Sequence, residues 1–329
     1  MSGGGSARCY WVEARGRGAL REVALTAPGP GERLVASQFS GISPGTERLV
    51  GLGLVPAADA AAMACQGMRG ALALPVAYGY SVVGAIADGP EAGMRVFTMH
   101  PHQERFVAPR ERLVELPAGV PSARATLLPN LETALNATWD AALRGDEDVL
   151  VVGGGAVGAL LSFVLARRHG GPTTLVEADA ARRRECAELP WRPRVVAPAE
   201  LPVGGAAVAL HASGTADGLQ AALDAVGFEG TVVELSWYGT RPVTLQLGGA
   251  FHHQRKRIVA SQVATIAPSH RAAGRAARTA AVLELLHDPA LDALLSAPIP
   301  FAILPEWFGR LYRGEARERC PLVIYQPKP

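Results

Sequence analysis

The chain has 329 residues, 49% hydrophobic and 19% charged, a composition that fits about two globular domains and excludes a disordered or collagen-like protein. Its 32 Lys and Arg nearly balance 30 Asp and Glu, leaving a formal charge of +2, so bulk electrostatics predict neither nucleic acid nor an anionic membrane as a partner. Only Lys256 and Lys328 are lysines, and no tyrosine lies four positions before either. This nearly excludes a Schiff-base lysine and the Tyr-x-x-x-Lys pair of short-chain dehydrogenases.

The N-terminal part of the chain reads as short strands separated by Pro- and Gly-containing turns, such as those at 28–31 and 43–45. The expected strands are residues 33–38, 80–87, 95–98 and 105–107. This pattern predicts a β-rich first domain.

The pattern changes to helical periodicity over residues 124–143, broken once near Pro129. Short apolar strands then alternate with helices, which predicts a parallel sheet with helices on both faces. The expected strands are 148–152, 173–176, 207–211 and 230–235, and the expected helices are 157–168 and 218–225.

The character shifts again after a strand-like segment at 258–262. Ser269 is expected to cap a helix that runs to His287. The tail, with a helix at 304–311 and a strand at 321–325, fits neither a third domain nor a linker. We therefore expect residues 1–126 and 263–329 to form the first domain and residues 127–262 the second.

The strongest motif is a Gly-x-Gly-x-x-Gly turn that follows a strand and opens a helix. Gly153 allows the tight turn, Gly155 lets the backbone approach a pyrophosphate, and Gly158 allows helix–sheet packing. Ala156 and Val157 open the helix whose N-terminus would face the phosphates. The alternative is a glycine turn that binds nothing.

Glu177 lies 19 residues after the last glycine, where an acid would hold the hydroxyls of an adenosine ribose. A carboxylate repels a 2′-phosphate, so NAD is expected rather than NADP. Arg182 and its two neighbours could instead bind that phosphate, although an exposed helix face is the favoured interpretation. Further cofactor contacts are expected at the ends of two later strands, from Ser213, Ser236 and Trp237.

No leader, membrane span or disulfide framework is expected. The Gly/Ser-rich start has no apolar core, and glycines interrupt the charge-free run at 149–166. The cysteines form no Cys-x-x-Cys pair. A cytoplasmic location is therefore expected.

This arrangement, a dinucleotide domain between two pieces of a β-rich domain, resembles the medium-chain dehydrogenase/reductase superfamily over nearly the whole chain. The resemblance implies a GroES-like catalytic domain and a Rossmann domain. In the segment Phe39-Ser-Gly-Ile-Ser-Pro-Gly-Thr-Glu47, Ser43 stands where zinc-type alcohol dehydrogenases have a zinc-binding cysteine. Tyr80 replaces the zinc histidine in Tyr78-Gly-Tyr-Ser-Val-Val-Gly84, and Pro129 or Asn130 the third ligand. The resemblance therefore implies a zinc-independent protein.

The form Ser-Gly-Ile-Ser-x-Gly-Thr-Glu with Gly-Tyr is similar to the zinc-less branch that includes bacteriochlorophyllide a dehydrogenase. Residues 55–75 are Ala-rich and do not match what is expected of a chlorin-binding enzyme. The resemblance therefore implies the zinc-less branch for this chain but not the chlorin substrate.

Without a metal, a side chain must supply the proton. By the resemblance, Tyr80 is the main candidate, Thr46 occupies a hydroxyl-relay position and His100 lines the substrate pocket. Ser43 is a further candidate. The alternative for each is simple packing, and His100 with His102 could form an unrelated metal pair.

These observations predict a zinc-independent NAD(H)-dependent oxidoreductase acting on an alcohol/carbonyl pair of a small molecule. The alternatives are an enoyl or quinone reductase and a non-catalytic dinucleotide-binding protein. The resemblance also implies a homodimer.

Overall fold

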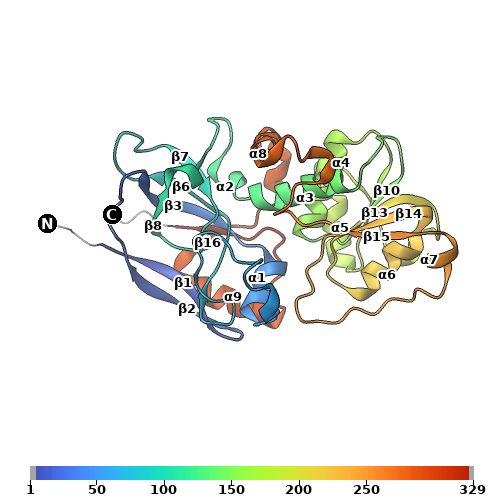
Figure 1. The fold of residues 1–329 in the computed structure, drawn as a ribbon, viewed down its shortest axis with the longest axis horizontal. Coiled ribbons are helices and arrows are strands. Elements are labelled where there is room, and N and C mark those ends of the chain that lie inside the picture. The colour runs from blue at the N-terminus through green and yellow to red at the C-terminus, as the bar shows by residue number, and fades with distance from the viewer. Residues whose placement is uncertain (1–4, 326–329) are drawn as a thin grey trace. The chain divides into compact units, whose positions relative to one another are not determined.

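The computed structural model describes residues 5–325 and divides the chain into two compact units (Figure 1). Unit 1 comprises the chain up to Pro129 together with the chain from Leu295 onward, and unit 2 comprises Asn130–Leu294. Among residues 5–325, no helix is long and apolar enough to cross a membrane.

Unit 1 is built from two sheets whose strands are almost all antiparallel. One has the order β2-β1-β5-β4, and the other β16-β17-β3-β6-β7-β9, with β8 paired to β3. The strands are β1 (Ser6–Ala14), β2 (Arg17–Ala24), β3 (Glu32–Gly41), β4 (Arg69–Gly70), β5 (Val76–Ala77), β6 (Val82–Ile86), β7 (Arg95–Thr98), β8 (Arg105–Pro109), β9 (Val114–Glu115), β16 (Ile299–Pro300) and β17 (Leu322–Ile324).

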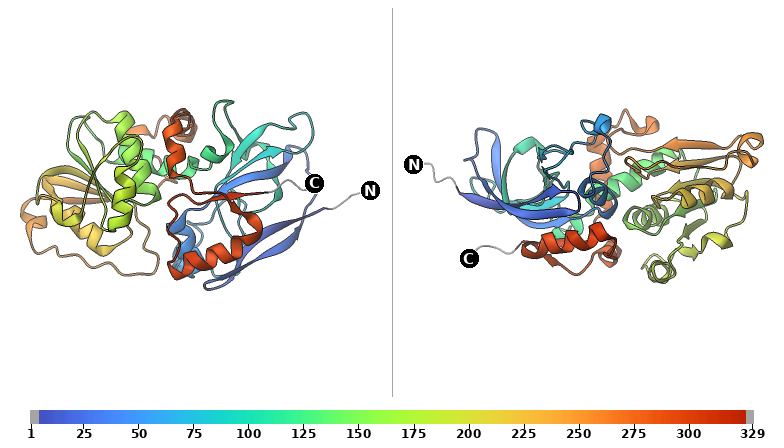
Figure 2. Two further views of the ribbon diagram at one scale, coloured as in Figure 1. Left: turned by 180° about the vertical axis from the view of Figure 1, so that it is seen from behind. Right: turned by 90° about the horizontal axis from the view of Figure 1, so that it is seen from below.

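Three helices accompany these sheets: α1 (Pro44–Gly51), α2 (Ser122–Ala125) and α9 (Leu304–Arg313). Helix α9 buries Leu304, Phe308 and Leu311 on one face, the spacing expected of an amphipathic helix. It lies along the β1–β2 hairpin, at least 280 residues away in the sequence (Figure 2). Phe308 of this helix stacks on Tyr10 with 4.4 Å between the ring centroids. The C-terminal segment is therefore an integral part of unit 1.

Unit 2 is organised around a six-stranded sheet in which every neighbouring pair is parallel, with the order β12-β11-β10-β13-β14-β15. The strands are β10 (Val149–Val152), β11 (Thr173–Val176), β12 (Arg194–Val196), β13 (Ala206–His211), β14 (Val226–Glu234) and β15 (Arg257–Ala260). The helices are α3 (Leu128–Asp140), α4 (Ala156–Arg168), α5 (Ala180–Ala187), α6 (Ala216–Ala225), α7 (Ala250–His253) and α8 (Gly274–Leu285). The predicted combination of a β-rich domain and a parallel α/β sheet is confirmed.

Two details differ from the sequence expectation. Ser269 does not cap a helix: Pro268–His270 forms a single 3₁₀ turn, and α8 begins at Gly274, whose φ of +75° interrupts the helical path. Residues 263–294 belong to unit 2. One contact that joins α8 to this unit comes from Arg278, whose buried guanidinium donates to Asn136 Oδ1 of α3 at 3.1 Å.

Candidate active site

Unit 1 brings together three of the side chains expected to handle a proton. Ser43 precedes α1, Thr46 lies in its first turn, and Tyr80 comes just before β6. The Tyr80 hydroxyl is hydrogen-bonded to the side chains of Ser43 and Thr46. Burial raises the pKa of Tyr80 well above its ordinary value, and the two hydroxyls oppose this rise. Tyr80 is therefore a protonated donor at neutral pH.

A second network, which the sequence did not reveal, supports this trio. Buried Glu47 accepts the backbone N–H of Ser43 on Oε1 at 2.9 Å and pairs with His102 Nε2 through Oε2 at 2.9 Å. The Nδ1 atom of His102 lies 2.7 Å from Ser40 Oγ, which in turn lies 2.9 Å from the Tyr325 hydroxyl. Both ring nitrogens of His102 have a hydrogen-bond partner, Ser40 on one side and Glu47 on the other. This arrangement does not favour the alternative in which His102 and His100 bind a metal together.

His100 has different surroundings. Its ring stacks on Phe106 with centroids 3.7 Å apart, and its Nδ1 lies 3.0 Å from the carbonyl oxygen of Pro101. Burial lowers the pKa of His100 to about 4. The ring is therefore neutral at pH 7, and its described hydrogen bond leads to Pro101 and not to Tyr80.

In unit 2 the glycine motif forms a backbone cradle between β10 and α4. Gly153 has a φ of +109°, and a Cβ there would lie 2.7 Å from Ser213 Cα. A Cβ on Gly158 would collide with the carbonyl of Gly153, whereas Gly155 faces open space apart from Arg182 Nη1 at 3.9 Å. Gly155 is also the N-cap of α4, so no side chain occupies the N-terminus of that helix. This open, uncapped N-terminus fits a pyrophosphate.

Glu177 follows β11 and lies against this cradle. Its Oε2 accepts the N–H of Gly154 at 2.7 Å, and its Oε1 accepts the N–H of Asp179 at 2.8 Å. These bonds hold the carboxylate beside the loop and leave lone pairs for hydroxyl donors. Arg182 is only half-buried, and its guanidinium approaches the same loop.

The ends of β13 and β14 carry a polar cluster that includes Ser213 and Ser236. Ser236 Oγ accepts the N–H of Gly214 at 3.0 Å and so joins the two strand ends. Ser213 Oγ lies 2.6 Å from Nε2 of His211, a fully buried ring that also bonds Glu234. Trp237 follows directly and is half-buried. Sequence reasoning did not find His211 and Glu234, because only the parallel pairing of β13 and β14 places them side by side.

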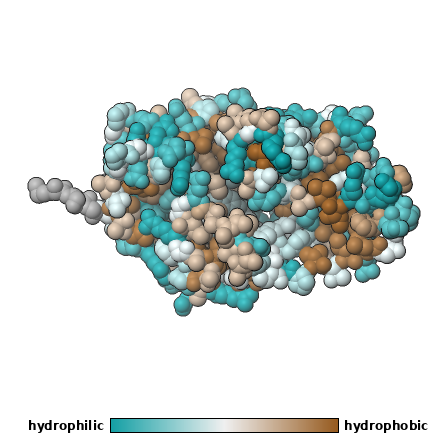
Figure 3. All heavy atoms as spheres, in the orientation of Figure 1, coloured by the Kyte–Doolittle hydropathy of each residue, from teal (hydrophilic) through white to brown (hydrophobic). Residues whose placement is uncertain are grey.

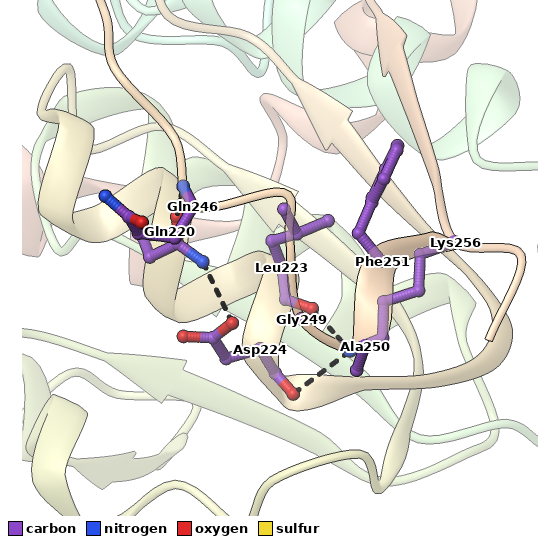
Figure 4. A pocket seen from close by; sticks show the side chains of 8 residues that line it. All are labelled: Gln220, Leu223, Asp224, Gln246, Gly249, Ala250, Phe251 and Lys256. Carbon is purple, nitrogen blue, oxygen red and sulfur yellow. Dashed lines mark hydrogen bonds between the residues drawn. The ribbon is translucent and has the colours of Figure 1, made fainter. Parts of the chain in front are cut away.

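A pocket of about 210 Å³ lies between the C-terminal end of α6 and helix α7 (Figure 4). Lys256 contributes to its wall but donates from Nζ to the carbonyl of Leu223 at 2.8 Å, at the C-terminal end of α6. Its cation caps that helix. The pocket is therefore separate from the glycine cradle, which lies at the carboxyl ends of the strands.

Comparisons with known proteins agree with this architecture. No protein-family model matches the chain. A 2-desacetyl-2-hydroxyethyl bacteriochlorophyllide A dehydrogenase from Cereibacter sphaeroides is 31% identical over 189 residues, which span 50% of this chain and 54% of that protein. The chain thus matches about half the length of this relative.

Two solved structures superpose over almost the whole chain. A putative zinc-binding dehydrogenase from Sinorhizobium meliloti, bound to NADP, has a TM-score of 0.75 at 18% identity and covers 97% of this chain and 99% of its own. The 2R,3R-butanediol dehydrogenase from Bacillus subtilis has a TM-score of 0.76 at 17% identity and covers 98% and 100%. The chain therefore has the fold of these dehydrogenases, as the resemblance to the medium-chain dehydrogenase/reductase superfamily implies. The predicted GroES-like and Rossmann domains are thereby confirmed.

The positions at which the resemblance implies zinc ligands can be examined on this structure. Zinc sites use thiolate, imidazole or carboxylate ligands. Ser43 and Tyr80 offer a hydroxyl and a phenol there, and these are bonded to each other. Within residues 5–325, no three His, Cys, Asp or Glu side chains gather in a way that could hold a metal ion. The residue types at the positions that the resemblance implies, Ser43 and Tyr80, are not those that a catalytic zinc uses.

Proposed function

We propose that this chain is an NAD(H)-dependent oxidoreductase that transfers a hydride between nicotinamide and an alcohol/carbonyl pair of a small molecule. The observation that carries the proposal is the glycine cradle with Glu177 fixed beside it. A cradle that a single Cβ would fill, next to an uncapped helix N-terminus, supports the binding of a dinucleotide.

The cofactor would be held by the residues around that cradle. The N–H groups at the start of α4 would face the pyrophosphate, and Glu177 would accept hydrogen bonds from the adenosine ribose. When bound, the nicotinamide ring donates or accepts the hydride. Solved relatives by fold carry NADP or NADH, which supports a nicotinamide cofactor.

Tyr80 would be the general acid that donates the proton to the substrate oxygen. In carbonyl reduction, negative charge develops on the substrate oxygen as the hydride arrives, and Tyr80 would donate its proton there. An alkoxide is a stronger base than a phenolate, so this transfer is downhill even from a phenol whose pKa is raised. Ser43 and Thr46 would then stabilise the phenolate, since their hydrogen bonds favour its charged form. In alcohol oxidation the same steps run in reverse.

We further propose that this chemistry is independent of zinc. The donor types at Ser43 and Tyr80 support this proposal. Elemental analysis of protein purified without chelator is expected to find far less than one zinc per chain. A stoichiometric zinc whose removal abolishes turnover would overturn it.

The main test is NADH titration followed by turnover with a panel of carbonyl substrates and activated alkenes. NADH binding with an alcohol product supports the proposal. A saturated carbonyl product would assign the chain to the double-bond reductases, and NADH binding without turnover across the panel would favour a binding protein. A bacteriochlorophyllide belongs in the panel because the relative from Cereibacter sphaeroides is named as a bacteriochlorophyllide dehydrogenase, but the match covers only about half of each chain. A cytoplasmic location stays a prediction.

A further inference from the structure

A buried hydrogen-bonded pair of side chains lies beneath the carboxyl ends of β13 and β14. His211 and Glu234 are direct partners in the parallel register, and their side chains are 0% and 13% exposed. His211 Nδ1 lies 2.8 Å from Glu234 Oε2. The same carboxylate also accepts the N–H of Ser236 at 2.6 Å and the hydroxyl of Tyr238 at 3.0 Å.

These hydrogen-bond donors favour the charged form of the Glu234 carboxyl group. Burial alone would raise the pKa of Glu234, but the hydrogen bonds from His211 and Ser236 hold the pKa below its ordinary value. A carboxylate surrounded by donors requires that His211 carry a hydrogen on Nδ1. In the tautomer that carries its hydrogen on Nδ1, Nε2 is an acceptor.

The ring in turn orients Ser213. Because Nε2 accepts, the Ser213 hydroxyl hydrogen points inward to the ring, 2.6 Å away. The Ser213 oxygen accepts the N–H of Thr215 at 3.2 Å and lies 2.9 Å from the Thr215 hydroxyl. Thr215 is exposed, so its hydroxyl can turn toward a ligand and leave Ser213 an acceptor position. Two adjacent hydroxyls in this state match the vicinal diol of a ribose.

The position of Ser213 indicates which ribose. Its Cα lies 2.7 Å from where a Cβ on Gly153 would stand, so it lines the cradle. Strand β13 flanks β10 on the side opposite β11, whose end carries Glu177. A dinucleotide spans the point where the strand order reverses, with its adenosine ribose at the acid. The ribose on the β13 side is then that of the nicotinamide half.

We propose that Ser213, with Thr215, binds the diol of the nicotinamide ribose, and that the buried Glu234–His211 pair is the positioning device that makes Ser213 an acceptor. This inference rests on the proposed nicotinamide cofactor. Glu234 and His211 touch no part of the cofactor and act only through Ser213.

The test compares three ligands by calorimetric titration of the full chain: NADH, ADP-ribose and ADP. ADP lacks the second ribose, whereas ADP-ribose has it without the nicotinamide ring. Ser213→Ala is expected to lower the affinity for NADH and for ADP-ribose by about 3- to 10-fold, the effect of one hydrogen bond. The affinity for ADP should stay unchanged. Glu177→Gln is expected to weaken all three ligands. Ser269→Ala, which removes an exposed hydroxyl elsewhere in unit 2, is the matched control.

Glu234→Gln tests the positioning role. The amide presents a donor, so the ring is expected to exchange its tautomer and turn the Ser213 hydrogen outward. The affinity for ADP-ribose should fall as much as in Ser213→Ala, while the affinity for ADP is unchanged. The double variant, Glu234→Gln with Ser213→Ala, should bind ADP-ribose no more weakly than Ser213→Ala alone. Additive losses, or an equal loss for ADP, would indicate a merely structural pair and overturn the positioning role.

The two proposals fail in different ways. If the unmodified chain binds neither NADH nor ADP, the proposed function fails and this inference with it. If the chain binds all three ligands and Ser213→Ala keeps full affinity for ADP-ribose, the proposed function stands and this inference is wrong. Thermal unfolding of each unliganded variant identifies any that does not fold, and Ser213→Ala, at a half-exposed position, decides the ligand question by itself.

Discussion

Tyr80 is the side chain on which the proposed chemistry depends. Tyr80→Phe keeps the ring and its packing but removes the donor. If Tyr80 is the general acid, the turnover number should fall by roughly 10²- to 10⁴-fold. NADH affinity should stay unchanged, because the cradle lies on unit 2. Steady-state kinetics and NADH titration of the same preparation measure the two effects.

Tyr78→Phe is the control for this experiment, since it removes a neighbouring phenol whose ring lies 6.1 Å from that of Tyr80. It should retain turnover. Near-normal turnover of Tyr80→Phe combined with its loss in His100→Ala would assign the proton to the histidine. Retained activity in both would favour double-bond reduction, which can take its proton from water.

His100 has a second, measurable consequence for stability. The pKa of His100 is about 4 in the folded protein, against an ordinary value of 6.5 in the unfolded chain. As pH falls below 6.5 the unfolded chain binds a proton that the folded chain refuses, so the free energy of unfolding decreases until about pH 4. From pH 7 to pH 5 the loss attributable to this ring is roughly 2 kcal/mol.

Chemical denaturation of the wild type and of His100→Asn at both pH values measures this contribution. The asparagine amide can still donate to the Pro101 carbonyl but does not titrate. The variant should lose about 2 kcal/mol less than the wild type on acidification. Equal losses in both proteins would show that His100 does not carry the effect.

We expect the β10–α4 connection and the end of β11 to select the cofactor together. Glu177 is held against the loop by the N–H of Gly154, and a 2′-phosphate at the ribose would face its carboxylate. NADH should therefore bind more tightly than NADPH, and Glu177→Gln should narrow the difference. Fluorescence titration of both cofactors measures this preference.

Arg182 is the residue that would favour NADPH, because its guanidinium approaches the same loop. Equal affinities for the two cofactors in the wild type would mean that Arg182 overrides the acid. Arg182→Ala would then restore the preference for NADH.

At the level of the whole molecule we expect a homodimer. Strand β15 is the last strand of the unit 2 sheet, and all four of its residues are exposed. Ile258 is 38% and Val259 41% exposed, and Figure 3 shows hydrophobic side chains on the surface of the second unit. An apolar sheet edge of this kind is a template for pairing with a second copy.

Light scattering at micromolar concentration should give twice the chain mass. Val259→Arg should shift the protein toward monomer, whereas Val203→Arg, at a residue that is 83% exposed in a loop before β13, should not. A monomeric wild type would contradict the prediction.

Local sequence patterns were enough to predict the strands and the glycine turn around the proposed dinucleotide site. The strands at 95–98 and 173–176 have the predicted bounds, and the glycine turn and Glu177 stand where their spacing placed them. These features depend on chain-local physics: the period of apolar residues, the conformational freedom of glycine and the reach of one βαβ unit. The hairpin β1–β2 was missed, since its alternation is weak in sequence and its packing partner is α9, near the other end of the chain.

By itself, the sequence determined the fold class, the cradle and the types of side chain available for a proton. Only the tertiary structure decided which of those side chains meet. Tyr80 joins Ser43 and Thr46, while Glu47 binds His102 and His211 binds Glu234. The physical reason is that a buried polar group must find a partner, and that partner comes from whichever strand lies alongside. Strand order and register are collective properties of the whole sheet, so no local spacing along the chain encodes them.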